Sequence, residues 1–180
     1  MSYIYSGHPA QGTTSPIAKR APIGLLAVAA LALAAAPMLM PASYSWLRHT
    51  TSESAAQGVA GAWLARLGFV GFGMAVTWLS PLLRTRWSPG VRALHTAFGL
   101  LMIATAVFAT RPWLPDAPFD PVEDALHSAA ATALGFAFVI GLVLRAPSRG
   151  RDWLGLALDA LGIVLSLAMP IAMLSGVVWV

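Results

Sequence analysis

The chain has 180 residues, 58% of them hydrophobic and only 10% charged, with a mean hydropathy of +0.73. A soluble domain carries about 25% charged residues, so this chain cannot cover a water-facing surface, and it is too apolar to be disordered. The absence of cysteine excludes a disulfide scaffold. The chain has 11 Lys+Arg and 7 Asp+Glu, and membrane orientation can explain this small basic excess, so we do not expect nucleic acid as a partner. We therefore predict an all-α, polytopic membrane helix bundle.

Residues 1–21 are polar and contain Gly, Pro, Ser and Thr. We predict that they form a cytoplasmic tail and that residues 22–180 form the transmembrane helical bundle. A signal peptide is the alternative interpretation, because Lys19-Arg20 resembles a basic region and residues 34–36 a small-residue cleavage site. The long tail and an apolar stretch of about 20 residues favour a retained tail.

Five segments are long and apolar enough to cross a bilayer, which takes about 20 residues for a hydrocarbon core of about 30 Å. They are residues 22–41, 62–83, 91–110, 125–144 and 153–180. The connections at 84–90 and 145–152 are very short, so the two helices that each one joins must be antiparallel neighbours.

Basic residues predict the orientation of the bundle. If the helices alternate in direction, eight basic residues fall on one side and three on or near the other. The eight are Lys19, Arg20, Arg84, Arg86, Arg92, Arg145, Arg149 and Arg151, and the three are Arg48, Arg66 and Arg111. The positive-inside rule makes the eight-residue side cytoplasmic, which predicts a cell (inner) membrane protein with its N-terminus inside and its C-terminus outside. The seven tryptophans support these boundaries, because all lie near a predicted span end, where indole rings prefer to sit.

Asp159 is an ionisable residue within the fifth span, and such residues are functional candidates because they are costly in a membrane. It belongs to a small, polar stripe that we expect to face the bundle. The stripe consists of Gly155, Asp159, Gly162 and Ser166. His95 enters the third span at a similar depth, and we predict an Asp159–His95 pair supported by Arg92. The pair is either a packing contact that fixes the register or part of a proton or ion relay; the lack of such groups at mid-membrane favours packing.

Arg66 lies four residues inside the second span, near its outer end. Its side chain can extend outward to the interface or pair with Glu53 or Asp124. We expect both together, in a structural role.

The loop before the fourth span is rich in carboxylates. Asp120 suits the helix N-cap, with Pro121 at the first helical position and Glu123 at the reciprocal capping position. Asp124 and His127 remain, three residues apart on one helical face.

His49 and Glu53 lie in the other external loop, and together with Asp124 and His127 they are candidates for an external site. Such a site would hold a divalent metal or a hydrolytic water. The alternative is that these residues are solvated or lock the loops. Their scatter over two loops favours this alternative, since zinc sites usually show a dense ligand motif, and we expect no metal.

Several familiar membrane chemistries do not fit the sequence. His95 and His127 lie near opposite ends of their spans, so they cannot ligate one haem together. Gly68, Gly71 and Gly73 lie inside a spanning helix, where glycines allow close helix packing rather than nucleotide binding. We expect no cofactor.

Residues 49–58, His-Thr-Thr-Ser-Glu-Ser-Ala-Ala-Gln-Gly, leading into 62–69, resemble the first outer loop and second helix of domain-of-unknown-function family 998. Residues 94–99 and 123–128 resemble its third and fourth helices. The resemblance covers about residues 22–180 and implies a bacterial multi-pass membrane protein with no established activity. Members of the family usually have six spanning helices, one more than the five predicted from this sequence. The resemblance places five residues at positions of the family's motifs but assigns them no role: Ser52, Glu53, Arg66, His95 and His127.

Three functions remain as hypotheses. The first is a non-catalytic accessory or scaffold subunit that packs against membrane lipids and against other integral membrane proteins or further copies of itself, which the small size and the Gly/Ala-rich helix faces favour. The second is a small transporter or lipid-handling protein that uses Asp159, His95 and Arg66. The third is a membrane hydrolase with an external polar or metal site.

Overall fold

A computed structural model describes residues 16–174, and every regular element in that range is a helix. The five α-helices are α1 (Arg20–Ala35), α2 (Ala62–Leu82), α3 (Pro89–Val107), α4 (Pro121–Arg145) and α5 (Trp153–Leu174). Four short 3₁₀ helices extend or connect them: η1 (Pro16–Lys19), η2 (Ala36–Leu39), η3 (Glu53–Ala55) and η4 (Ala146–Arg149). The predicted all-α class is confirmed.

Among the described residues, four helical segments are long and apolar enough to cross a membrane: Arg20–Leu39, Ala62–Leu82, Pro89–Val107 and Pro121–Arg149. In α5 the apolar stretch covers Trp153–Ala168 among the residues whose side chains the structure describes. The chain is therefore a multi-pass integral membrane protein. Most of the predicted tail, residues 1–15, and the end of the predicted fifth span, residues 175–180, lie outside the described residues.

Helices α3 and α4 begin before the predicted membrane spans 91–110 and 125–144, in both cases because a polar side chain caps the helix. Ser88 accepts a hydrogen bond from the Val91 amide at 3.3 Å, so α3 begins at Pro89. Asp120 accepts hydrogen bonds from the amides of Val122 and Glu123, so α4 begins at Pro121 and the predicted N-cap is confirmed.

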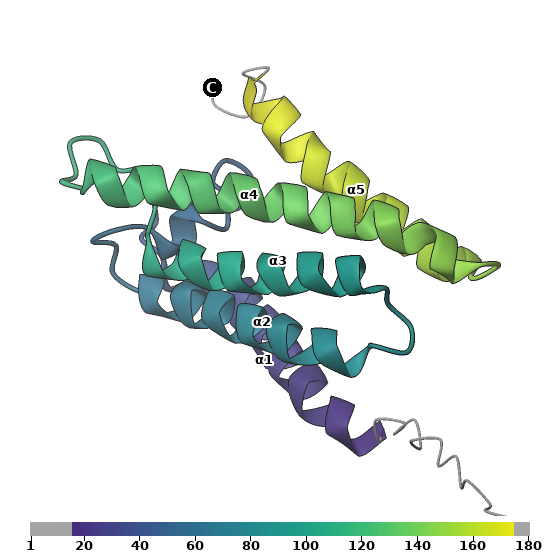
Figure 1. Cartoon of the computed structure of the whole chain (residues 1–180). Helices are drawn as coiled ribbons and strands as arrows, with labels where there is room; N and C mark the ends of the chain where they lie inside the picture. The colour runs from purple at the N-terminus through teal and green to yellow at the C-terminus, as the bar shows by residue number, and fades with distance from the viewer. Residues whose placement is uncertain (1–15, 175–180) are drawn as a thin grey trace, which may run out of the picture.

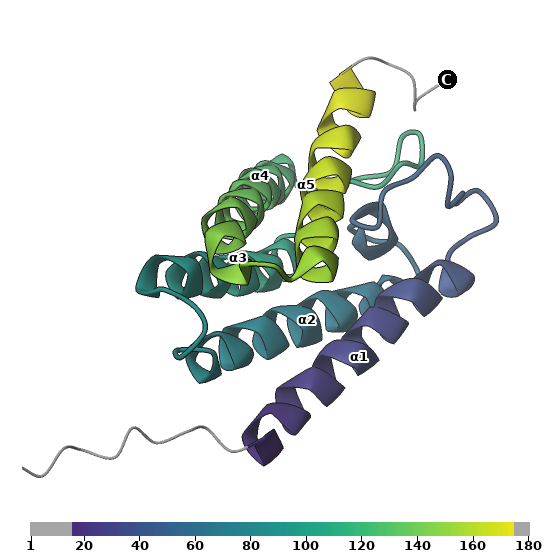
Figure 2. The ribbon, with the colours of Figure 1, turned by 90° about the vertical axis from the view of Figure 1, so that its right-hand side faces the viewer.

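The helices run alternately up and down, and α1 to α4 pack side by side in chain order (Figures 1 and 2). The connections 83–88 and 146–152 lie at one end of the bundle, which we call the basic end. Residues 40–61 and 108–120 lie at the other, which we call the loop end. Helix α5 begins at the basic end, packs on α4 and then diverges from it in both views.

Glycines allow the close approach of α1, α2 and α3, as predicted. A Cβ on Gly73 would collide with the carbonyl oxygen of Gly99, and a Cβ on Gly99 would collide with Thr77. A Cβ on Gly68 would collide with Leu33 of α1. These positions bring the helix backbones into contact, which is how membrane helices gain packing energy.

The predicted stripe on α5 faces α4. Gly155 and Asp159 are buried, and Gly162 and Ser166 are half-buried. A Cβ on Gly162 would lie 3.1 Å from Leu142 of α4. The rest of the described α5 surface is largely exposed and carries large apolar side chains, so this helix is attached to the bundle along one narrow line.

Candidate functional site

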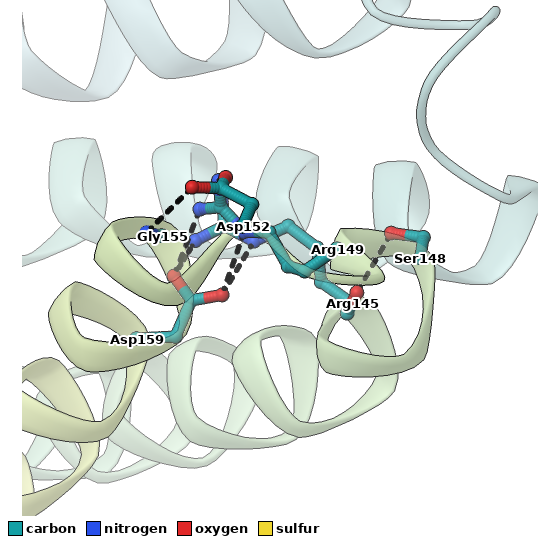
Figure 3. A network of polar contacts seen from close by, with 6 residues as sticks. All are labelled: Arg145, Ser148, Arg149, Asp152, Gly155 and Asp159. Atoms are coloured by element: carbon teal, nitrogen blue, oxygen red, sulfur yellow. Dashed lines mark hydrogen bonds and ion pairs between the residues drawn. The ribbon is translucent and has the colours of Figure 1, made fainter.

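Asp159 is only 4% exposed and is held by two arginines at the basic end. Arg145 donates from Nε to Oδ2 at 3.3 Å and from Nη2 to Oδ1. Arg149 donates from Nε to Oδ2 and from Nη2 to Oδ1, both at 3.1 Å. Figure 3 shows both guanidinium groups gathered on this one carboxylate. A buried carboxylate needs such compensation, because desolvation of an unpaired charge costs several kcal/mol.

The chain brings these residues together by ending α4 and turning sharply. Arg145 is the last residue of α4 and Arg149 the last of η4, and cations are favoured at helix C-termini. Gly150 then takes a φ of +57°, in the left-handed region that glycine tolerates best. Asp152 accepts a hydrogen bond from the Gly155 amide at 2.9 Å and binds Nη1 of Arg149 at 2.8 Å.

A Cβ on Gly155 would collide with the ends of the Asp152 and Arg149 side chains, so a larger residue there would push these two side chains aside. The Gly155 amide and, to a lesser degree, the Arg149 guanidinium hold the pKa of the Asp152 carboxyl below its usual value. Asp152 therefore remains ionised to more acid pH than a free aspartate does.

The predicted Asp159–His95 pair is wrong. Nδ1 of His95 lies 2.9 Å from the Val91 carbonyl oxygen, and its ring packs on Trp87 with centroids 4.4 Å apart. Two arginines that approach along the same turn are stronger partners for a carboxylate than one imidazole. Arg92, the predicted support, makes none of these contacts.

His95 nevertheless lies close to the ionic cluster. The Arg145 guanidinium sits 5.5 Å from the centroid of the Trp87 ring on which His95 packs. Gly141 of α4 makes room for the imidazole, because a Cβ there would lie 2.9 Å from its Cε1 atom. His95 and Asp159 also line one cavity of about 480 Å³.

At the loop end, Arg66 binds the backbone. It donates from Nε to the Ala55 carbonyl at 3.0 Å and from Nη2 to the Ala56 carbonyl at 3.1 Å. The predicted pairing with Glu53 or Asp124 is wrong. Those carbonyls belong to the last residue and the C-cap of the short helix η3, where they lack helical partners, and the guanidinium satisfies both at once.

Glu53 and Asp124 also serve backbone groups. Glu53 accepts from the Thr50 amide at 2.6 Å and from the Thr50 hydroxyl at 3.0 Å. Asp124 accepts from the Arg111 amide at 2.8 Å and from the Thr110 hydroxyl at 3.1 Å. Each carboxylate thereby fixes a turn in the loops.

Glu123 and His127 of α4 tie down the end of α3. Glu123 accepts from the Ala109 amide at 2.7 Å, so its predicted reciprocal cap on Asp120 is wrong. The buried His127 places Nδ1 2.8 Å from the carbonyl oxygen of Phe108 and 3.1 Å from that of Thr105. Helix α3 ends earlier than predicted, and these two side chains engage the backbone groups at its end.

His49 belongs to an aromatic cluster in the first loop. Its Nδ1 accepts from the Ser45 amide at 2.8 Å, and its ring centroid lies 5.2 Å from those of Tyr44 and Trp113.

Burial and, to a lesser degree, the charge of Glu53 raise the pKa of Tyr44. Ser52 precedes η3 without capping it through its side chain.

The four external candidates do not converge. Glu53 and Asp124 line one cavity of about 930 Å³, whereas His49 and His127 are not among its lining residues. Within residues 16–174, no group of three or more His, Asp or Glu side chains is arranged to hold a metal ion.

Three important residues escaped the sequence reasoning. The buried Gln57 donates to the carbonyls of Ala109 and Asp120 at 2.8 and 3.1 Å and accepts from the Asp120 amide at 2.7 Å, joining the two loops. The sequence signal for Gln57 was a long side-chain amide within a stretch of small residues, directly before a glycine.

Arg145 and Arg149 were used only to predict the orientation of the bundle. Their i, i+4 spacing before Gly150 indicates that they share one helical face.

The comparisons with known proteins give one finding. A family model described as "Protein of unknown function (DUF998)" matches residues 19–179. No curated protein and no solved structure matches the chain.

Proposed function

The chain belongs to the DUF998 family of proteins of unknown function, and from its own geometry we propose that it is a non-catalytic accessory or scaffold subunit that makes lateral contacts in the membrane. Its partners in this proposal are other integral membrane proteins or further copies of the chain, together with lipids. The proposal includes an inner-membrane location in a bacterium. The excess of arginine at the basic end supports the orientation in which this end lies in the cytoplasm.

The observation that carries the proposal is a face of small residues on the loop-end half of α4, where α5 has diverged (Figure 1). Five exposed residues make up this small face: Ala125, Ser128, Ala129, Thr132 and Ala133. They recur at intervals of three and four, so they lie on one side of the helix. Small residues at this spacing let a second membrane helix approach closely, with hydroxyl groups available for interhelical hydrogen bonds.

The outward face of α5 has a different character. Its exposed residues include Leu154, Leu158, Leu161, Val164 and Leu165. Large apolar side chains suit lipid tails, whereas small ones give lipid tails little contact area and leave room for another helix. The contrast favours the small face of α4, rather than α5, as the protein-binding surface.

The use of the loop-end polar residues supports a structural role over hydrolysis. Glu53, Asp124 and His127 each engage backbone groups in turns or at a helix end. A general base or metal ligand needs its electron pairs directed toward a substrate or ion. In this protein the carboxylate oxygens of Glu53 and Asp124 and the Nδ1 atom of His127 lie against backbone groups and hold the loops in place.

Purification from native membranes in a mild detergent, followed by native mass spectrometry, tests the proposal. We expect a stoichiometric complex that Ala129→Leu dissociates, because the added side chain separates the packed helices. Ala160→Leu, on the exposed surface of α5, is the matched control and should leave the complex intact. A monomer in the unmodified protein, or equal behaviour of the two variants, would overturn the proposal.

A further inference from the structure

Two cavities meet at Arg145 and Arg149. The first, of about 480 Å³, has a predominantly apolar lining, with the side chains of Phe72, Phe98 and Leu158 among its walls. We call it the apolar cavity. The second, of about 580 Å³, lies against the turns of the basic end and is lined by both arginines as well. We call it the polar cavity. Volumes of about 300–1,000 Å³ are typical of ligand sites.

The apolar cavity lies among the spanning helices. Its walls come from α2, α3, α4 and α5, and it extends along α5 from Leu158 to Ser166. Gly135 of α4 also lines it, and nothing lies within 4 Å of where a Cβ on this glycine would be. The wall is therefore open at Gly135, and the apolar cavity is suited to a hydrocarbon chain.

The polar cavity carries a net positive charge. Three arginines line it, against the carboxylate of Asp152 in the lining and the carboxylate of Asp159, which binds two of the three, so one positive charge is left over. The hydroxyl residues Thr85 and Ser148 add hydrogen-bonding groups. The arginines are Arg86, Arg145 and Arg149. This composition fits a phosphate group, since guanidinium groups match its geometry and its charge.

Asp159 prepares Arg145, one of the two shared arginines, for such a ligand. Its bonds to Arg145 involve Nε and Nη2, whereas a guanidinium has five N–H donors. The carboxylate thus orients Arg145 and leaves Nη1 available, and the Trp87 ring beneath the guanidinium restricts it further. A pre-oriented donor loses little freedom when it binds.

We infer that the two cavities together form a binding site for one anionic phospholipid of the cytoplasmic leaflet. An acyl chain occupies the apolar cavity, and the phosphate of the headgroup lies in the polar cavity against Arg86, Arg145 and Arg149. The occupant must be an amphiphile, because an apolar and a cationic compartment adjoin, and the location among spanning helices supplies such molecules from the bilayer. The inference goes beyond the lateral partner proposed above and needs no second protein.

The test uses the full-length protein in nanodiscs of phosphatidylglycerol and phosphatidylcholine in equal amounts. After transfer to mild detergent, native mass spectrometry counts the lipids that each chain retains. We expect one retained phosphatidylglycerol. Retention of phosphatidylcholine at the same level, or of no lipid, would overturn the inference.

Gly135→Leu tests the apolar cavity. The open space at Gly135 accepts the larger side chain without moving a neighbour, so the variant should fold and lose the retained lipid. Gly24→Leu is the matched control, because its Cβ position on α1 is equally open and lies outside both cavities. Equal lipid retention in the two variants would contradict an acyl chain in the apolar cavity.

Arg86→Gln tests the polar cavity without touching the Asp159 cluster. The loss of one charge-assisted hydrogen bond should lower the preference for phosphatidylglycerol about tenfold. Arg151→Gln removes an exposed charge of the basic end that lines neither cavity and should change nothing. An unchanged preference in Arg86→Gln would overturn the assignment of the headgroup. The Ala129→Leu experiment is independent, so the failure of one proposal leaves the other intact.

Discussion

The two ends of the bundle use polar side chains in different ways. At the loop end, side chains such as Gln57, Arg66 and Glu123 bind backbone groups. At the basic end, charged side chains bind one another, with two arginines on Asp159. At the loop end, the polar side chains fix the loops that connect the helices, whereas at the basic end they place cationic donors beside two cavities. Polar residues of similar type therefore have a structural role at the loop end, and we expect them to bind a ligand at the basic end.

The difference follows from the backbone at each end. The loop end contains two long connections, 40–61 and 108–120, with little regular structure. Their amides and carbonyls need partners, and side chains from α2, from α4 and from the first loop itself supply them. At the basic end the connections are short, so helix ends approach closely and their charged residues meet directly.

Loss of the Asp159 carboxylate should have the largest effect. Asp159→Leu leaves Arg145 and Arg149 without their shared anion, which should cost about 3–5 kcal/mol of unfolding free energy. Thermal or denaturant unfolding in detergent measures it. Asp152→Asn alters only the exposed rim of the same cluster and should cost much less. Equal losses in the two variants would show that the buried pair does not hold the basic end together.

At the loop end, the largest effect is expected from Gln57. Gln57→Ala removes partners from the Asp120 amide and the carbonyls of Ala109 and Asp120, at a cost of about 1–3 kcal/mol. Hydrogen exchange should become faster in residues 109–120 and stay unchanged at residues 145–155. A uniform change along the chain would contradict separate roles for the two ends.

Two glycines of α4 should respond with opposite signs to the same substitution. Gly141→Ala forces a Cβ against His95 and should destabilise the protein by about 1 kcal/mol or more. Gly135→Ala meets open space and should stabilise α4 by about 0.5–1 kcal/mol. Unfolding of both variants under identical conditions gives the comparison, and a shared sign would contradict the packing of His95 on α4.

The smallest effects concern pH, and they differ between the ends. Because the pKa of Asp152 is lowered, its contribution is present above the ordinary aspartate value of 3.8 and is lost as the pH falls below it. The raised pKa of Tyr44 makes its contribution present below the ordinary tyrosine value of 10.0 and lost as the pH rises above it. Asp152→Asn should thus reduce only the acid loss of stability and Tyr44→Phe only the alkaline loss, as measured by melting temperature.

The sequence predicted the elements and faces well, because these depend on local patterns. The helices, the Asp120 cap and the α5 stripe follow from apolar runs, capping residues and helical spacing. The partners of Arg66, Glu123 and Asp159 could not be predicted in this way. Arg66 and Glu123 bind backbone groups whose positions depend on how the loops fold, and Asp159 binds arginines that only the turn at Gly150 brings within reach.

In our proposal, the basic end binds an anionic phospholipid, whereas the polar residues of the loop end have a structural role only. Hydrogen exchange of the full-length protein in nanodiscs, with phosphatidylglycerol compared with phosphatidylcholine, tests it most directly. We predict that phosphatidylglycerol slows exchange in residues 145–155 and leaves residues 109–120 unchanged. Equal exchange in the two lipids at residues 145–155, or an equal change at both ends, would contradict the claim.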